Sequence, residues 1–466
     1  MERPNVLLIH TDQQRWDALG ANGNQEIHTP NLDRLAQEGV NFDHYFVQNP
    51  VCMPSRLSYL TGQYPSTHGV YRNGVPVPED TLALPGLLDN YGYISANIGK
   101  LHFLPHANRD HRDPHPKYGF DHLEISDEPG PYADAYRAWV KKKDPTRLDD
   151  ISVGLPPAAA RWQQVMGTED GINHPAERFP KRPVSFEGGR EFTHSAFVAE
   201  RTIDFIEGHA NDRFLCIAGF YSPHSPWVAP EEFFDLYDRE KLSLPNFPER
   251  LEEKRGEDFF SDQELLGAKQ GYYGMVSEVD GHVGRILERL EELGLRENTI
   301  VVFTSDHGEY LGDHLSYGKG SPGYDPISRV PLIFSSPDDS IDDGRTFEGI
   351  VEAVDLVPTL LDCVGVPLAP HLGGESLLPL LSGKKKGSDK VALTESEGAK
   401  SIRTKRFRYV IREDGEESLF DLVQDPGEYH NLVEDESKEK KLSELRKRAL
   451  EKVIKVERIR PRSWAY

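Results

Sequence analysis

Short apolar runs without polar alternation recur along this chain and alternate with helical patterns. Such a run is typical of a strand that is buried on both faces of a sheet. The runs lie at residues 5–10, 93–98, 214–220, 299–304 and 330–334. Amphipathic periodicity lies between them, most clearly over residues 29–39, 194–208 and 264–295. The sequence therefore predicts an α/β fold, with a mostly parallel central sheet sandwiched by helices.

A change of pattern near residue 383 predicts a second unit. The segment 383–387 consists of glycine and lysine and indicates an exposed boundary. Beyond it, short strands are predicted at 391–393, 407–412 and 418–422, and an amphipathic helix over 432–456. We therefore expect a main domain over residues 1–382. A C-terminal α+β subdomain, a short antiparallel sheet plus a helix, is expected over residues 383–466.

The charge balance restricts the partners that this chain can have. Lys plus Arg number 54 and Asp plus Glu number 77, so the net charge is −23. This balance disfavours nucleic acid and anionic membranes, which select basic surfaces. A signal-peptide pattern and a run of about 18 apolar residues are both absent, so a cytoplasmic protein without a membrane span is expected. An anionic substrate would need a locally positive pocket.

The stretch Cys52-Met53-Pro54-Ser55-Arg56 has the pattern of a helix start. Pro54 suits a first helical turn, and Gly62 suits the end of a short helix. Cys52 would then lie at the helix N-terminus, where free N–H groups favour anions. Arg56 would project from the same face. The alternative is a loop thiol beside a surface arginine.

The other two cysteines stand in a different setting. Cys216 and Cys363 lie in apolar runs and are predicted to be buried core thiols. Three cysteines in these settings predict no disulfide framework.

Two carboxylates and an imidazole follow predicted strands. Asp12 comes directly after the first apolar run, and Asp306 and His307 follow the run at 299–304. If those strands are neighbours, the three side chains converge at one edge of the sheet. Carboxylate oxygens suit Ca²⁺, Mg²⁺ or Mn²⁺, and the imidazole shifts the preference toward Mn²⁺ or Zn²⁺. The alternative is that each aspartate only caps a turn.

Together these motifs resemble the sulfatase family of the alkaline phosphatase superfamily. The resemblance extends from residue 5 to about residue 432. Its elements lie at residues 5–12, 29–36, 52–56, 99–102, 222–227 and 305–309, with further landmarks at 329–332 and 419–426. It implies an alkaline phosphatase-like fold in which residues 1–382 form the catalytic domain.

The resemblance also implies a modified nucleophile. Cys52 would be converted to formylglycine by a formylglycine-generating enzyme, which reads Pro54 and Arg56. One hydroxyl of the hydrated aldehyde, a gem-diol, would attack the ester. Loss of the proton from the other hydroxyl would re-form the aldehyde and release sulfate.

The same resemblance assigns a metal site. It implies one divalent cation, Ca²⁺ in the first place with Mn²⁺ or Mg²⁺ as alternatives. Its ligands would be Asp12, Gln13, Asp306, His307 and the modified Cys52.

Positive and acid/base side chains complete the set that the resemblance implies. Arg56, Lys100 and Lys319 would orient the gem-diol or neutralise the sulfate. His224 would hold or protonate the leaving oxygen, and His102 would help to remove the gem-diol proton. Asn73, in the segment 71–74, would contact the substrate. By local pattern alone, His224 is a loop histidine, Lys319 an exposed lysine and the segment 71–74 an Asn-Gly turn.

These observations predict hydrolysis of a sulfate monoester, with a carbohydrate or another small alcohol as the leaving group. This chain departs from the family pattern at two positions: many sulfatases have aspartate where it has Gln13 and asparagine where it has His307. These departures leave an alternative function open. Relatives that cleave phosphonate monoesters and phosphodiesters share this chain's pairing, so such a hydrolase is the first alternative. A catalytically silent binding relic and a thiol hydrolase are the others. The sequence leaves the oligomeric state open, with a homo-oligomer as one alternative.

Overall fold

The structure is a computed structural model. It describes residues 3–106, 109–152, 183–255, 260–337, 341, 344–385, 387 and 390–457. Part of the segment 100–189, which the sequence predicts to be loops and short helices, lies outside the described residues.

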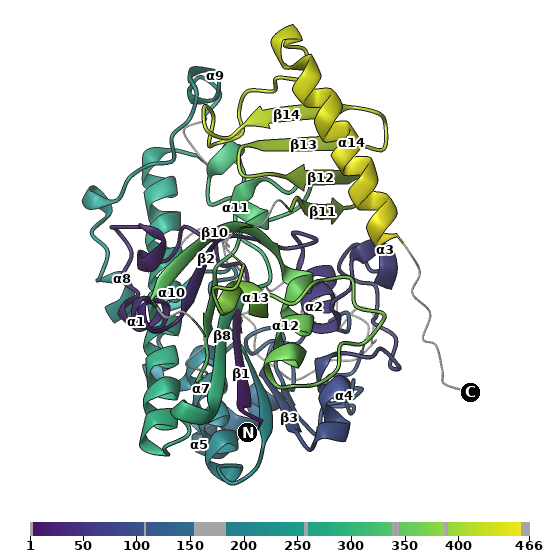
Figure 1. Ribbon diagram of the computed structural model, residues 1–466. Helices are drawn as coiled ribbons and strands as arrows, with labels where there is room; N and C mark the ends of the chain where they lie inside the picture. The colour runs from purple at the N-terminus through teal and green to yellow at the C-terminus, as the bar shows by residue number, and fades with distance from the viewer. Residues whose placement is uncertain are drawn as a thin grey trace.

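A central sheet of eight strands organises the main part of the chain (Figure 1). In spatial order these are β10 (Arg345–Glu352), β2 (Val40–Phe46), β9 (Leu332–Ser335), β8 (Thr299–Ser305), β1 (Asn5–Thr11), β6 (Phe214–Gly219), β3 (Ile94–Gly99) and β4 (His122–Ile125). All neighbouring pairs are parallel except those of β9, which runs antiparallel to β2 and β8. The predicted mostly parallel sheet is confirmed. A short parallel pair, β5 (Val184–Ser185) and β7 (Val228–Ala229), lies apart from it.

Helices cover both faces of this sheet. The described helices before the small sheet are α1 (Pro30–Glu38), α2 (Cys52–Thr61), α3 (Pro65–His68), α4 (Leu84–Leu88), α5 (Ala135–Lys143), α7 (His194–Gly208), α8 (Glu231–Phe234), α9 (Glu249–Glu252), α10 (Asp262–Glu292), α11 (Asp325–Ser328), α12 (Leu356–Cys363) and α13 (Leu378–Leu381). Side chains of α1, α5, α7 and α10 share one apolar core, and those of α2, α4, α12 and α13 share another. Figure 1 shows these two groups on opposite sides of the strands.

Strand β1 shows why its apolar run has no alternation. Leu7 and Ile9 belong to the core under α7 and α10, whereas Val6 and Leu8 belong to the core under α2 and α12. All residues of β1 are buried. Because successive side chains point to opposite faces, a strand with a core on each side needs apolar residues at every position.

The C-terminal part forms a four-stranded antiparallel sheet crossed by a helix. The strands are β11 (Ala392–Ser396), β12 (Ala399–Arg403), β13 (Phe407–Arg412) and β14 (Glu417–Asp421). Figure 1 shows α14 (Glu439–Val456) lying across them. Leu442 and Leu445 of α14 pack into the core that this sheet forms.

The sequence pattern does not predict every element of the structure, and it predicts one helix start at the wrong residue. The strands β2, β10 and β12 were not predicted, because polar residues interrupt their apolar patterns. The prediction of a helix from residue 432 is wrong in its start: α14 begins at Glu439, after a turn at residues 433–434 and a 3-10 helix at Glu436–Lys438. Cys363 is partly rather than fully buried, because it ends α12. None of the helices in the described part of the chain has the length and apolar character needed to cross a bilayer.

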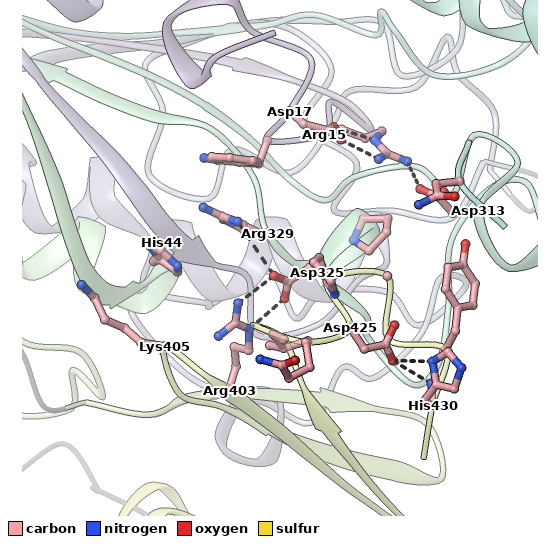
Figure 2. Close-up of a pocket in the computed structure, with 18 of the residues that line it drawn as sticks. Arg15, Asp17, His44, Asp313, Asp325, Arg329, Arg403, Lys405, Asp425 and His430 are labelled. Carbon is pink, nitrogen blue, oxygen red and sulfur yellow. Dashed lines mark hydrogen bonds and ion pairs between the residues drawn. The ribbon is translucent and has the colours of Figure 1, made fainter. Parts of the chain in front are cut away.

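Buried ion pairs join the small sheet to the main part of the chain. Asp325 of α11 accepts hydrogen bonds from Arg403 at 3.0 and 2.9 Å and from Arg408. Arg408 is fully buried and also pairs with Glu428. Figure 2 shows Arg403 and Arg329 pointing at Asp325 in a pocket of about 800 Å³. Among the described residues that line this pocket, none is predicted to take part in the chemistry.

We expect Asp325→Asn to lower the free energy of unfolding by about 3 kcal/mol, because it leaves the buried guanidinium of Arg403 without its carboxylate partner and that of Arg408 with Glu428 alone. Burial would raise the pKa of Asp325, but Arg403 and Arg408 outweigh it and hold the pKa well below its usual range. Its stabilisation is therefore complete above the unfolded value of about 3.9 and is lost as the pH falls below that value.

Urea unfolding at pH 7 measures this effect. The control is Glu348→Gln, which removes an exposed partner of Lys405 and should leave the stability nearly unchanged. Equal effects of the two substitutions would contradict the role of the buried network.

Candidate active site

The carboxyl ends of β1 and β8 bring the predicted ligands together. These strands are adjacent and parallel, with Thr11 opposite Ser305, so Asp12 and Asp306 emerge side by side. Ligand atoms of Asp12, Cys52, Asp306 and His307 all lie within 4.8 Å of one another, and the four residues are buried. The sequence prediction that these side chains meet at one edge of the sheet agrees with this geometry.

Helix α2 places Cys52 at the centre of the group. The helix begins at Cys52 and ends before Gly62, which has a left-handed φ of 67° and donates its N–H to the Ser58 carbonyl. The Cys52 side chain is only 1% exposed. Its Sγ lies 3.3 Å from Nε2 of His307.

Arg56, on the same face of α2, holds both carboxylates. Its Nε donates to Oδ2 of Asp306 at 2.7 Å, and one terminal nitrogen lies 3.2 Å from Oδ2 of Asp12. The other terminal nitrogen donates to the Lys100 carbonyl at 3.0 Å. Burial would lower the pKa of Arg56, but Asp306 and Asp12 outweigh it, so the guanidinium stays charged.

Two lysines complete the positive surroundings. Nζ of Lys100 lies 2.7 Å from Oδ2 of Asp12 and 4.8 Å from the centre of the Tyr221 ring. Nζ of Lys319 donates to Sγ of Cys52 at 2.8 Å and to Oε1 of Gln13 at 3.1 Å. Burial would lower the pKa of each lysine. The anionic partners, Asp12 for Lys100 and Cys52 for Lys319, outweigh it and raise the pKa.

The two predicted acid/base histidines flank the group. Nδ1 of His224 contacts the Ser225 carbonyl at 2.6 Å, and this imidazole is near enough to Asp12 to lower the pKa of that carboxyl. The backbone N–H of His102 donates to Asp127 at 2.8 Å, and its ring lies 4.2 Å from that of His106. Burial lowers the pKa of both His224 and His102 well below the usual value.

Asn73 faces the start of α2. Its Oδ1 accepts the N–H of Met53 at 3.0 Å, and its Nδ2 lies 3.9 Å from Sγ of Cys52. Asn73 therefore stabilises the start of α2 and lies close to the Cys52 thiol. A plain Asn-Gly turn would need neither contact.

Comparison with known proteins identifies the family. A model of the sulfatase family matches residues 4–366, and a model described as the C-terminal part of N-sulphoglucosamine sulphohydrolase matches residues 312–455. The chain belongs to the sulfatase family. An arylsulfatase of Clostridium perfringens is 32% identical over 480 residues, which cover 96% of this chain and 93% of that protein. This sulfatase is therefore a hydrolase that acts on sulfate esters.

Two further relatives belong to the wider superfamily. The multifunctional alkaline phosphatase superfamily protein PehA of Trinickia caryophylli is 30% identical, over 93% of this chain and 92% of its own. The crystal structure of a phosphonate monoester hydrolase of Agrobacterium radiobacter superposes with a TM-score of 0.81 at 26% identity, covering 97% of this chain and 96% of that one. The alkaline phosphatase-like fold expected from the sequence is confirmed.

The donor set of the sulfatase fits a divalent cation. Arg56 binds Oδ2 of both aspartates, so Oδ1 of Asp12 and Oδ1 of Asp306 are left on the side of His307, each 3.6 Å from its Nε2. Buried carboxylate oxygens that face one point need a positive charge between them. Gln13 presents its amide oxygen to the same region.

Histidines recur along the segment 102–122, a composition that is also found at metal sites. Among the described residues, only Asp12, Cys52, Asp306 and His307 form a group of such side chains close enough together to hold a metal ion. The ring of His102 packs at a tilt against that of His106, and the ring of His111 stacks on Tyr132. These contacts favour a packing role for the segment.

Sequence reasoning gave no role to Glu309, which the structure places directly behind Gln13. Its carboxylate accepts from the Gln13 amide and is 1% exposed. A signal was present, because Glu309 comes three residues after Asp306 at the end of the same buried strand. Only the tertiary contact shows which residue the carboxylate holds.

The unmodified Cys52 should titrate as an acidic thiol. Burial and Asp12 would raise the pKa of Cys52, but Lys319, His307 and Lys100 outweigh them and lower it. In metal-free protein carrying an unmodified cysteine, thiolate absorbance should therefore appear below the usual pKa of about 8.5. Cys216 should stay protonated there, because burial raises its pKa.

The measurement is a pH titration of thiolate absorbance, with Cys52→Ser as the control that removes the signal. Lys319→Ala should move the transition to higher pH. A transition at or above 8.5 in the unsubstituted chain would contradict the cationic surroundings of Cys52.

Proposed function

We propose that this sulfatase cleaves a sulfate monoester of a carbohydrate or another small alcohol through a formylglycine made from Cys52. The observation that carries the proposal is the position of Cys52. It starts a buried helix, in contact with Lys319 and His307, beside two carboxylates that Arg56 holds. A structural thiol needs none of these charged neighbours.

Each side chain around Cys52 has its own role in the proposed reaction. One hydroxyl of the hydrated aldehyde, beside the Lys319 ammonium, loses its proton to water and attacks sulfur. The S–O bond to the alcohol breaks, and His224 gives that oxygen a proton. His102 then accepts the proton of the second hydroxyl. The carbonyl re-forms as the carbon–oxygen bond to sulfate breaks, sulfate is released, and addition of water to the aldehyde restores the gem-diol. Arg56, Lys100 and Lys319 stabilise the negative charge throughout.

The residues that would hold a divalent cation are Asp12, Gln13, Asp306, His307 and the modified Cys52, with Ca²⁺ preferred over Mn²⁺ or Mg²⁺ for its oxygen donors. A bound cation would supply Lewis-acid polarisation and orient sulfate oxygens. The amide of Gln13 and the imidazole of His307 make the site less negative than one built from carboxylates alone.

A second candidate function is hydrolysis of phosphonate monoesters or phosphodiesters at the same site. The neutral donors Gln13 and His307 support it, as do the likeness to PehA and to the phosphonate monoester hydrolase structure. The arylsulfatase likeness favours sulfate monoesters in the first place.

Peptide mass spectrometry and paired assays test the proposal. We expect the peptide that contains Cys52 to carry an aldehyde when a formylglycine-generating enzyme is co-expressed. The protein should then cleave 4-nitrophenyl sulfate faster than a 4-nitrophenyl phosphonate monoester. Cys52→Ala should abolish turnover, and Cys216→Ala should keep it at reduced stability.

An unmodified thiol together with full turnover would overturn the proposed nucleophile. A clear preference for the phosphonate ester would leave the nucleophile in place and select the second candidate function.

Lys100→Ala and Lys319→Ala should each lower kcat by about 10²-fold, because each removes one buried charge aimed at the reacting group. Steady-state kinetics with 4-nitrophenyl sulfate measure the loss. Lys385→Ala, outside the site, is the control and should leave kcat unchanged. Rates near that of the unsubstituted enzyme in both site variants would remove these lysines from the reaction.

A further inference from the structure

Glu309 is a buried carboxylate with every hydrogen bond directed at parts of the active site. Its Oε1 accepts the backbone N–H of Leu311 at 3.0 Å and that of Gly318, and its Oε2 accepts from Nε2 of Gln13. We propose that Glu309 is the positioning residue that orients the Gln13 amide toward the cation site and fixes the loop that carries Lys319. This inference rests on the proposed cation site.

The neighbours of Gln13 admit one orientation of its amide. A carboxylate only accepts hydrogen bonds and an ammonium only donates them. Gln13 lies between Glu309 on one side and Nζ of Lys319, at 3.1 Å, on the other. The amide nitrogen must therefore face Glu309, and the amide oxygen must face Lys319, whose Nζ also contacts Sγ of Cys52. A reversed amide would place oxygen against oxygen and nitrogen against nitrogen.

The backbone of Gln13 supports the same assignment. Its φ is 73°, a left-handed conformation that is uncommon for residues other than glycine. Its N–H donates to Oδ1 of Asp306 at 3.0 Å, and its carbonyl accepts from the Tyr272 hydroxyl at 2.7 Å. A strained backbone held by several partners points to a side chain whose position matters.

Glu309 also closes the loop that leads to Lys319. Tyr310 donates its N–H to the Gly318 carbonyl at 3.0 Å, and Gly312 donates to the Ser316 carbonyl at 2.9 Å. The Gly318 N–H returns to Glu309, so both ends of the segment 310–318 meet at one carboxylate. Lys319 is the next residue. The buried carboxylate of Glu309 thus orients the amide of Gln13, a proposed cation ligand. It also fixes the position of the Lys319 ammonium, a proposed catalytic group.

Exchanging the two side chains tests this orientation, because each variant makes a defined set of hydrogen bonds between positions 13 and 309. In Glu309→Gln, the new amide oxygen accepts the Leu311 and Gly318 N–H groups, but its nitrogen meets the nitrogen of Gln13. In Gln13→Glu, two carboxylates face each other. In the double variant Gln13→Glu/Glu309→Gln, the new amide donates to the new carboxylate, and all three hydrogen bonds return.

Titration calorimetry with Ca²⁺ on the purified full chain is the measurement. We expect Glu309→Gln to weaken Ca²⁺ binding by about tenfold or more, as losses of ligand-orienting partners do. The double variant should bind Ca²⁺ more tightly than either single variant, because the restored hydrogen bond again orients the side chain at position 13. Glu395→Gln, a buried glutamate of β11, is the matched control and should not change the affinity. If Glu309 only stabilised the fold, a substitution at Gln13 would not restore the Ca²⁺ affinity that Glu309→Gln loses.

Urea unfolding in EDTA separates this inference from the cation site itself. If the unsubstituted protein binds no Ca²⁺, the proposed Ca²⁺ site fails. The inference then stands only if both single variants lower the unfolding midpoint and the double variant restores it. Unchanged Ca²⁺ affinity in Glu309→Gln, or additive losses in the double variant under either measurement, would overturn the role of Glu309.

Discussion

The buried guanidinium of Arg56 is the interaction on which the candidate active site depends. It binds Asp12 at the end of β1 and Asp306 at the end of β8, and all three side chains are fully buried. Two carboxylates this close repel each other strongly in a medium of low polarity unless a cation lies between them. Arg56 belongs to α2, so the same contact anchors the helix that starts at Cys52. One cluster of contacts therefore fixes the ends of β1 and β8, the position of α2 and the position of Cys52.

The cluster also explains how a chain with a net charge of −23 can serve an anionic ester. Its long-range field repels sulfate, but salt screens that field beyond about 8 Å at physiological ionic strength. At the site itself, Arg56, Lys100 and Lys319 face two aspartates, and a bound cation would add further positive charge. Fixed local charge therefore decides substrate capture, and the overall charge has little influence.

Much of the fold could be predicted because the sheet is buried on both sides. Strands such as β1 need apolar residues at every position, which gives a clear signal, and the cap residues around α2 marked its ends. The antiparallel direction of β9 and the existence of β12 depend on partner strands, which a local pattern does not reveal. Asp12 and Asp306 could be predicted as neighbours from strand ends. The link from Glu309 through Gln13 to Lys319 could not, because it joins residues about 300 positions apart.

The most direct test of this account is Ca²⁺ binding to Arg56→Lys, measured by titration calorimetry. Lysine keeps the positive charge but lacks the fork that reaches both Asp12 and Asp306. The account predicts a folded protein in which Ca²⁺ affinity falls by about tenfold or more, because the two carboxylates are no longer held with their Oδ1 atoms on the side of His307. Affinity equal to that of the unsubstituted chain would show that the site does not depend on Arg56 and would contradict the account.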